Sequence, residues 1–474
     1  MGNGPTIVWL RRDLRLDDHA ALTAAVERGR PVVPVVFVNR DSLSPARAWW
    51  LHHSLTALQA ELAAIGGRLL IRTGHPADGL ARLADETAAD CVAYTPHLAP
   101  AERDEERAVA EALPSGVALA AERSGNLFEP GTILSKQGTP YLIYTPFAKA
   151  CLSAPTCPRP TRAPLRLPSS EPWPAGVTVD DLALAPAAGS CCGLGHQWEP
   201  GPHGAMRRLS WLTERRAKQY HIDRDRPDLH ATSGLSPHLA FGEVSARRVW
   251  HAVLHSRGDK PYAELPDGHR CFLDELLWRE FAQQVLYHRP ELEREPLRPK
   301  FANLAHRHDP AALAAWQQGL TGYPVVDAGM RQLLRLGWMH NRVRMIVASF
   351  LVKDLLLPWQ QGAAWFAEQL VDLDEGCNGL NWQWSAGCGI DSSVFTRVFN
   401  PMTQGAKFDP DGRYVRRWVP ELAQLPDRYL HAPWTAPDQV LATAGVRLGE
   451  TYPQPIVDHA QARLRALAAY ASVR

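Results

Sequence analysis

Five short apolar runs in the first part of the chain constrain its fold more than any other feature. They are rich in Val, Ile and Leu, as strands buried on both faces of a parallel sheet are. Segments with a helical spacing of apolar residues, such as 46–65, separate them. This alternation predicts an α/β, Rossmann-like domain with a five-stranded parallel sheet over residues 1–130. The expected strands are 6–10, 32–38, 68–72, 90–94 and 117–120.

The composition changes after residue 130. Prolines recur through CLSAPTCPRPTRAPLRLPSSEPWPAG, which starts at Cys151, and such a long irregular stretch is typical of a linker that wraps the surface. We therefore expect a linker over 131–203 and an all-α C-terminal domain over 204–474. The expected helices of that domain include 207–220, 245–255, 270–287, 310–318, 327–336, 341–356 and 363–370.

Charge and cysteine content exclude several classes of protein. Lys and Arg number 51 and Asp and Glu number 50, so the net charge of +1 gives no global field that would favour nucleic acid or a membrane. The eight cysteines show no CxxC pair and no histidines at zinc-finger spacing, which predicts free thiols and no metal site. No apolar run has membrane-spanning length and no signal peptide is evident, so we expect a cytoplasmic protein without a membrane partner.

The turn after the first expected strand reads RRDLRLDDHAAL instead of the GxGxxG of dinucleotide-binding domains. Its arginines could bind phosphate at the carboxyl end of the sheet. We favour a solvated turn in which these arginines form salt bridges with Asp13, Asp17 and Asp18.

The stretch 372–384, DLDEGCNGLNWQW, combines carboxylates, amides and indoles in a mixture that is too polar for a core and too aromatic for a surface. A ligand-binding segment has this composition. A helix that ends at Gly376 and Gly379, with Trp382 and Trp384 packed in the core, would account for it equally well.

Two further segments carry polar groups that suit a ligand. TSGLSPHLAFGEVS, residues 232–245, offers backbone and hydroxyl donors to a phosphate, and it also suits a helix start with Pro237 in the first turn. FLDELLWREFAQQ, residues 272–284, places Glu275, Trp278 and Arg279 on one helical face, where they could bind a flat polar ligand. On that segment alone, a surface ion pair covered by an indole is the preferred interpretation.

A basic strip follows in the expected C-terminal domain. Between residues 330 and 353 the chain has no acidic residue, and aromatic and methionine side chains lie among the cations. This pattern is expected where phosphates lie beside unstacked bases. The cations are Arg331, Arg335, Arg342, Arg344 and Lys353, and the interleaved side chains are Trp338, Met339 and Met345.

Together these motifs resemble the photolyase/cryptochrome flavoproteins, above all the bacterial class I cyclobutane pyrimidine dimer photolyases. The resemblance covers essentially the whole chain, and GWMHNRVRM followed by WQW is its most specific part. The motifs that carry it are WLRRDLRLDDHAAL, YTPF, TSGLSPHL, ELLWREF, TGYPVVDAGMRQL, GWMHNRVRMIVASFLVKDLL, NWQWSAGCG, RVFNP and YPQPIVDH.

The resemblance implies an α/β antenna domain and a helical domain that buries FAD. It places the FAD phosphates beside Tyr220 and residues 232–236, pairs Arg344 with Asp372 beside the flavin ring, and turns Asn378 toward flavin N5. The full set of expected FAD contacts is Tyr220, Thr232, Ser233, Gly234, Leu235, Ser236, Phe272, Arg279, Trp338, Asn341, Arg344, Asp372, Leu373, Asp374 and Asn378.

The resemblance also implies a partner and a reaction. The partner is UV-damaged DNA with a cyclobutane pyrimidine dimer, which photoexcited, reduced FAD splits by electron transfer, and a monomer is expected. The alternative is a cryptochrome-type blue-light photoreceptor without repair activity; Asn378 and the WQW motif favour repair. The expected catalytic residues are Glu275, Asn378, Trp382 and Trp359. The expected DNA and substrate contacts are Arg224, Glu275, Trp278, Asn341, Arg342, Met345, Trp384 and Arg397.

Two departures from the family pattern stand out. The electron relay of the family has three tryptophans, and here the third position is His306, which Trp316 or Trp365 could replace. The antenna segment TPHLAPAERDEE, residues 95–106, keeps only Glu102 of the usual pattern. An antenna chromophore could therefore be 5,10-methenyltetrahydrofolate or 8-hydroxy-5-deazaflavin, or the pocket could be empty.

Overall fold

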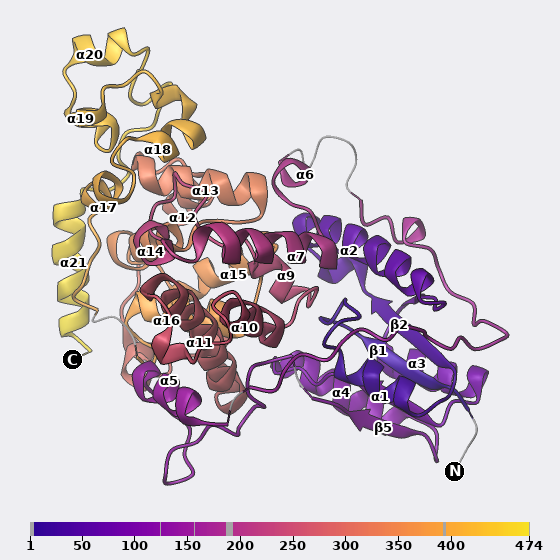
Figure 1. Ribbon diagram of the computed structural model, residues 1–474. Helices are drawn as coiled ribbons and strands as arrows, with labels where there is room; N and C mark the ends of the chain where they lie inside the picture. Colours follow the sequence, from indigo (N-terminus) through magenta and orange to yellow (C-terminus); the bar gives the residue numbers. More distant parts are fainter. Residues whose placement is uncertain (1–3, 124, 156, 186–192, 392–394, 474) are drawn as a thin grey trace. The chain divides into compact units, whose positions relative to one another are not determined.

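The structure is a computed structural model that describes residues 4–123, 125–155, 157–185, 193–391 and 395–473 (Figure 1). The chain divides into two units. Unit 1 comprises Met1–Lys218 and Ser233–Pro290, and unit 2 comprises Gln219–Thr232 and Glu291–Arg474. The domain limits expected at residues 130 and 203 stay a prediction. Cysteines 191 and 192 lie outside the described residues, and the other cysteines are free thiols.

A five-stranded parallel sheet forms the first part of unit 1 (Figure 1), which confirms the predicted α/β class. Its order is β3-β2-β1-β4-β5, and Thr6 of the central strand lies in register with Val32 on one side and Cys91 on the other. The first two strands have the predicted limits, and the other three begin one or two residues later than predicted. The strands are β1 (Thr6–Leu10), β2 (Val32–Val38), β3 (Leu70–Thr73), β4 (Cys91–Tyr94) and β5 (Ala118–Ala121).

Helices cover both faces of this sheet. The strand order reverses direction after β3, so right-handed crossovers put the first two helices on one face and the next two on the other. Ile7, Trp9 and Val33 pack with Leu83 of the third helix and Val109 of the fourth in one core cluster. The helices are α1 (Ala20–Glu27), α2 (Pro45–Ala64), α3 (Pro76–Thr87) and α4 (Pro100–Ala112).

The turn after β1 differs from the solvated turn predicted for it. Asp18 is only 3% exposed, and its carboxylate accepts hydrogen bonds from Ser245 and Arg247, more than two hundred residues further along the chain. Arg11 instead pairs with Glu106 at 2.6 Å, and Arg12 pairs with Glu102 at 2.8 Å. The local salt-bridge prediction was wrong because distant segments of unit 1 supply the partners of this turn.

The proline-rich stretch forms backbone hydrogen bonds with the sheet of unit 1. The carbonyl of Pro168 accepts a hydrogen bond from Val32 N, and Val177 N donates to Ile71 O. Six more helices belong to unit 1: α5 (Tyr144–Ser153), α6 (Leu194–Gln197), α7 (Pro202–Trp211), α9 (Ser236–Ala240), α10 (Ala246–His255) and α11 (Asp267–His288).

The described residues of unit 2 are helical and share one large hydrophobic core. Its α-helices are α8 (Tyr220–Asp223), α12 (Pro310–Gln318), α13 (Pro324–Leu336), α14 (Asn341–Ser349), α15 (Trp359–Gln369), α16 (Glu375–Ala386), α17 (Pro401–Phe408), α18 (Arg413–Trp418), α19 (Asp427–Leu430), α20 (Asp438–Thr443) and α21 (His459–Ala471). In the described part of the chain, no helix is long and apolar enough to cross a membrane.

Two helices predicted as continuous are interrupted. The predicted helix 341–356 is α14 followed by a π-helix over Phe350–Asp354. The predicted helix 207–220 is α7 followed by a π-helix over Leu212–Arg216, and α8 begins only at Tyr220. A π-helix widens the turn and inserts a residue, which the apolar period of the sequence does not reveal.

Candidate functional site

The stretch 372–384 contains the start of a helix. Asp374 is the N-cap of α16, and its Oδ1 accepts a hydrogen bond of 2.9 Å from Cys377 N. Gly376 and Gly379 lie inside the helix, which ends only at Gly387 with a φ of +74°. The interpretation in which the helix ends at these two glycines is therefore wrong, because the side-chain cap of Asp374 starts the helix just before them.

The expected ion pair of unit 2 is present. Nη2 of Arg344, on α14, lies 3.0 and 2.8 Å from the two carboxylate oxygens of Asp372, and its Nε donates to Met339 O at 2.8 Å. The Asp372 side chain is 3% exposed. A carboxylate held at both oxygens by one guanidinium keeps a fixed direction, so this pair is a rigid polar group just before α16.

Asn378 is also fixed in direction. On α16 its Nδ2 donates a hydrogen bond of 3.1 Å to Ala363 O of α15. This hydrogen bond occupies the amide nitrogen of Asn378 and holds the side chain in one orientation. Leu373 is buried beside this segment, whereas Asn341, the first residue of α14, is exposed.

His340 carries a buried donor with no partner. It caps α14 by accepting a hydrogen bond at Nδ1 from Arg342 N, and burial lowers its pKa to about 4. The neutral ring therefore carries its proton on Nε2. In the described part of the chain, Nε2 has no hydrogen-bond partner. An orphaned donor of this kind suits a site that a polar cofactor fills.

The indole of Trp382 is part of the core of unit 2. Its ring is 2% exposed and packs on Gly362 of α15, where a Cβ would lie only 2.1 Å from the indole. Trp316 contacts it edge to face at a centroid distance of 6.1 Å, and Phe366 at 5.0 Å. Trp382 thus has aromatic neighbours in more than one direction.

Trp359 lies one helical turn from Gly362 on α15 and is 4% exposed. It lines a cavity of about 240 Å³ that His306 also lines. The residues expected at the second and third relay positions, Trp359 and His306, therefore line one cavity. Trp365, the other proposed substitute, has a buried indole nitrogen without a partner among the described residues.

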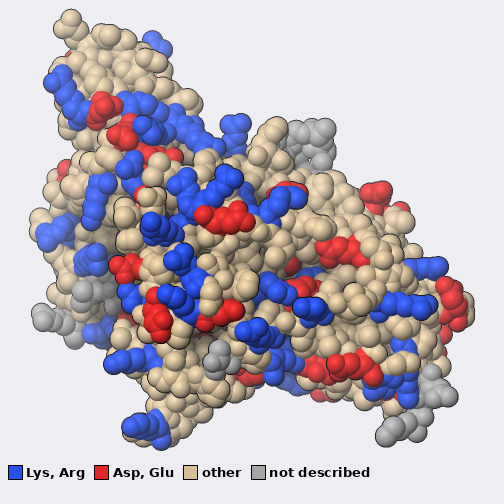
Figure 2. Space-filling model, in the orientation of Figure 1, with Lys and Arg blue, Asp and Glu red and all other residues tan. Residues whose placement is uncertain are grey.

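The cations expected to meet DNA have different surroundings within unit 2. Arg342 pairs with Asp225 at 2.7 Å and lies 4.5 Å from the centre of the Phe408 ring. Arg224 lies over the ring of Tyr220, and the exposed Arg397 lies over that of Phe399. On the face drawn in Figure 2, acidic side chains lie among the basic ones.

Three half-buried residues of unit 2 complete the sequence-predicted set. Trp338, Met345 and Trp384 pack against the core without being fully buried. Part of each side chain therefore stays accessible.

In unit 1 the residues predicted on one helical face all lie on α11. The indole of Trp278 stacks on Tyr144 of α5 at a centroid distance of 3.6 Å and an angle of 6°. Nη1 of Arg279 donates to the Asn126 side chain at 3.3 Å, and Phe272 is buried. Glu275 lies one turn before Trp278 and is half-buried. Residues far away in the sequence, Tyr144 and Asn126, therefore hold the indole and the guanidinium, in addition to any i,i+4 pair on the helix surface.

The expected phosphate loop of unit 1 has the geometry of a helix start. Oγ of Ser233 accepts a hydrogen bond of 3.2 Å from Leu235 N, Gly234 has a φ of +67°, and α9 begins at Ser236 with Pro237 in its first turn. This geometry is compatible with both interpretations of the motif, a phosphate-binding loop and a simple helix start. Thr232 and Tyr220 belong to unit 2, where Tyr220 is the first residue of α8.

Sequence reasoning missed the partners that orient these side chains. Tyr144 supports Trp278, Asn126 binds Arg279, and Arg208 lies against Gly234. Tyr144 belongs to YTPF, one of the motifs that carry the family resemblance, so the sequence did single out this segment. No local signal identifies Asn126 or Arg208.

Comparisons with known proteins agree with these features. Residues 272–472 match the family described as FAD binding domain of DNA photolyase, and residues 6–168 match DNA photolyase. A deoxyribodipyrimidine photo-lyase of Agrobacterium fabrum is 45% identical over 99% of this chain and 98% of its own length. Cryptochrome-1 of Arabidopsis thaliana is 36% identical over 97% of this chain and 70% of its own.

A solved structure refines this similarity. The crystal structure of a bacterial class III photolyase from Agrobacterium tumefaciens matches with a TM-score of 0.94 and 44% identity, over 100% of this chain and 98% of that one. The motifs indicated class I enzymes as the nearest group, and this match to a class III enzyme corrects that expectation.

Proposed function

Because the chain belongs to the DNA photolyase and cryptochrome family, we propose that it is a light-dependent DNA repair lyase of the class III type. Its substrate is a cyclobutane pyrimidine dimer in UV-damaged DNA, and its cofactor is FAD. The stack of Trp278 on Tyr144 carries this proposal, since it supplies a rigid aromatic surface one helical turn from a carboxylate. The full-length identity of 45% with a deoxyribodipyrimidine photo-lyase supports it.

FAD fits the polar groups that each unit offers. In unit 2, the Arg344–Asp372 pair, the fixed amide of Asn378 and the orphaned Nε2 of His340 are suited to a large polar cofactor. When bound, reduced FAD supplies one electron to the dimer after absorbing light and takes it back after the ring opens. The proposed FAD ligands are Tyr220, Thr232, Ser233, Gly234, Leu235, Ser236, Phe272, Arg279, Trp338, Asn341, Arg344, Asp372, Leu373, Asp374 and Asn378.

The chain's own residues act mainly by binding and orientation. Trp278 of unit 1 and Trp384 of unit 2 are the proposed stacking surfaces for the extruded pyrimidines, and Glu275 hydrogen-bonds their edges. A dimer stacks poorly in the duplex, so its extrusion costs less than that of normal bases, which favours damaged sites. Met345 and Asn341 are further substrate contacts, and Arg224, Arg342 and Arg397 bind phosphates.

Trp382 and Trp359 serve in this proposal as the inner members of an electron relay, which keeps the cofactor reduced. Both are almost fully buried in the core of unit 2. A buried indole is shielded from water and held in place, so it can pass an electron without rearrangement of the protein. Asn378 and Glu275 act beside the cofactor and the substrate, respectively.

A second chromophore of the folate or deazaflavin type stays a prediction for the α/β part. At the carboxyl ends of β1 and β4, Arg11 and Arg12 pair with Glu106 and Glu102, so a ligand at this edge must bridge or displace these ion pairs. The absorption spectrum of the purified protein tests this prediction: a second chromophore would add absorption bands to those of flavin. We also propose that the protein acts as a cytoplasmic monomer and uses no metal.

Illumination of the purified, reduced protein with a dimer-containing oligonucleotide tests the repair function. We expect thymine to be recovered in the light and not in the dark. Protein that contains FAD and binds the oligonucleotide without recovering thymine would favour the photoreceptor alternative. Protein without FAD would contradict both functions.

A further inference from the structure

Arg208 of α7 is a half-buried cation without a counter-ion. Its Nη2 donates a hydrogen bond of 2.9 Å to Gln197 O, and its guanidinium lies 5.4 Å from the centre of the Trp198 ring. Burial alone lowers its pKa. No described carboxylate forms a salt bridge with it. Its neighbour Arg207 is exposed and pairs with Glu199.

A partly buried guanidinium without an anion is unfavourable. Removal of the charge from water costs free energy, and the interactions with a carbonyl and an aromatic ring offset this cost only in part. A bound anion would offset the rest of this cost through charge-assisted hydrogen bonds. The surroundings of Arg208 therefore suit an anionic ligand.

Gly234 lies directly beside the guanidinium of Arg208. A Cβ added at Gly234 would lie 3.4 Å from both Cζ and Nη1 of Arg208 and 3.5 Å from its Nε. The guanidinium thus packs directly against the loop Ser233–Ser236. The φ of +67° at Gly234 also disfavours any residue with a side chain at this position. No side chain of the loop therefore occupies the space beside Gly234 that the guanidinium of Arg208 fills.

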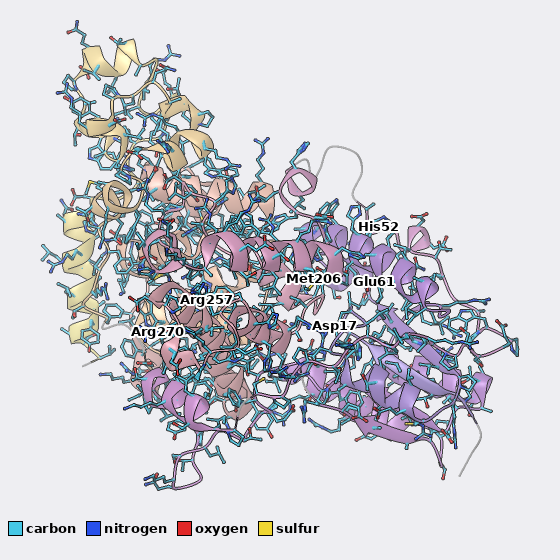
Figure 3. The ribbon with its side chains drawn as sticks, viewed as in Figure 1. Asp17, His52, Glu61, Met206, Arg257 and Arg270 are labelled. Carbon is cyan, nitrogen blue, oxygen red and sulfur yellow. The ribbon has the colours of Figure 1, made fainter. Side chains whose placement is uncertain are left out.

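Arg208 also borders a surface hollow that contains both basic and acidic side chains. Arg208 lines a hollow of about 950 Å³ together with His196, His203 and Arg215. Figure 3 labels Met206, which lines the same hollow on α7. Glu199 and Glu214 also line it, so the hollow has mixed charge, whereas the loop Ser233–Ser236 offers hydroxyl and backbone donors.

We propose that Arg208 binds the pyrophosphate of FAD beside the loop Ser233–Ser236. This inference rests on the proposed FAD function and adds to it a cation from α7. A planar guanidinium fork matches the oxygens of a phosphate and gives a stronger bond than a neutral donor. Arg208 is then a cofactor-binding residue that none of the sequence motifs contains.

The rate at which FAD leaves the full-length holoprotein tests this role. We expect Arg208→Gln to release FAD about tenfold faster than the wild type, because a charge-assisted hydrogen bond is lost. Arg207→Gln removes the same charge from the next residue of the same helix and should change the rate less than about twofold. Flavin fluorescence after dilution measures the release.

Thermal unfolding separates cofactor binding from a structural role. The FAD-bound form of Arg208→Gln should unfold at a lower temperature than wild type, while the FAD-free forms should unfold alike. An equal loss in both forms would assign Arg208 to the packing of Trp198 and overturn the proposal. Equal release rates for Arg208→Gln and Arg207→Gln would overturn it as well.

A second variant keeps the test decisive if Arg208→Gln does not fold. Arg208→Lys retains the positive charge and loses the planar pair of guanidinium donors. It should therefore release FAD faster than wild type, and more slowly than a variant with a neutral side chain at this position. A rate equal to that of wild type would contradict the proposal. Absence of FAD from the wild-type protein would contradict the proposed function itself, which distinguishes the two failures.

Discussion

The ring of Tyr144 lies parallel to the indole of Trp278, with centroids 3.6 Å apart and planes inclined by 6°. Tyr144 belongs to α5 and its hydroxyl donates a hydrogen bond of 3.1 Å to Asp274 O on α11. One face of Trp278 is thus covered by a ring that is itself tied to the same helix. This arrangement restricts the rotation of the indole.

We expect Tyr144→Ala to weaken binding of dimer-containing DNA by about two- to tenfold, the range for loss of an aromatic pair. Tyr144→Phe keeps the stack and loses only the hydroxyl, so it should bind nearly as well as wild type. Competition with undamaged DNA in a gel-shift assay measures both. Wild-type affinity in Tyr144→Ala would show that Trp278 needs no support.

Trp382→Phe should slow photoreduction of the flavin and leave repair by pre-reduced enzyme unchanged, since repair does not need the relay. Trp359→Phe should have the same effect if the electron moves toward the cavity that Trp359 shares with His306. Trp316→Phe slows photoreduction instead if the electron leaves through the edge-to-face contact of Trp316 with Trp382. Transient absorption after a flash compares the three; equal rates in Trp382→Phe and wild type would place the start of the relay elsewhere.

Asp372→Asn should lower the free energy of unfolding by about 1–3 kcal/mol, because the half-buried Arg344 loses its only ionic partner among the described residues. Glu421→Gln removes the partner of Arg331 from a more exposed pair and should cost less than about 1 kcal/mol. Urea denaturation of both variants gives the comparison. Equal losses would show that burial of Asp372 adds nothing to its pair.

Burial raises the pKa of Glu280 on α11 to about 7. The folded protein therefore binds this proton more tightly than the unfolded chain, and stability falls as the pH rises from about 4.5 to about 7. The shift corresponds to about 3 kcal/mol above that range. Glu280→Gln keeps an oxygen for the backbone donor of Phe128, so it should equal wild type at pH 4.5 and exceed it at pH 8.

The difference between the two proteins isolates this carboxyl from other titrating groups. Denaturation midpoints measured from pH 4.5 to pH 8 should separate steadily up to about pH 7. A constant difference over that range would show that Glu280 does not titrate there.

Arg397→Ala should lower the salt dependence of DNA binding by about one unit of slope, because an exposed arginine that binds a phosphate releases about one counter-ion. Arg342→Ala should change the slope less, since Asp225 already neutralises Arg342 at 2.7 Å. Binding constants over a range of salt concentrations give both slopes. A larger effect for Arg342 would mean that DNA displaces Asp225.

The sequence predicted those parts of the fold that depend on local patterns. The runs that became β1 and β2 have the predicted limits because, apart from Thr6, both strands are apolar along their whole length. Periodicity also placed Glu275, Trp278 and Arg279 on one helix. The π-helix Phe350–Asp354 escaped prediction, since an inserted residue leaves the apolar period of its neighbours unchanged.

Contacts between distant segments could not be predicted in this way. Asp18 meets Arg247, and Trp278 meets Tyr144, across more than one hundred residues of chain in each case. The prediction of local salt bridges around Asp18 failed because burial gave the carboxylate other partners. Arg208 was missed for the same reason, since only the folded chain brings it to Gly234.

The closeness of Gly362 to the Trp382 ring links two positions over evolutionary time. A methyl group at 362 would lie 2.1 Å from the indole and 2.6 Å from Cδ2 of Leu351, so alanine is compatible with the present core only after both side chains give way. Glycine at 362 and tryptophan at 382 should therefore be inherited together. Position 362 can begin to vary only in lineages that replace the tryptophan and also repack Leu351.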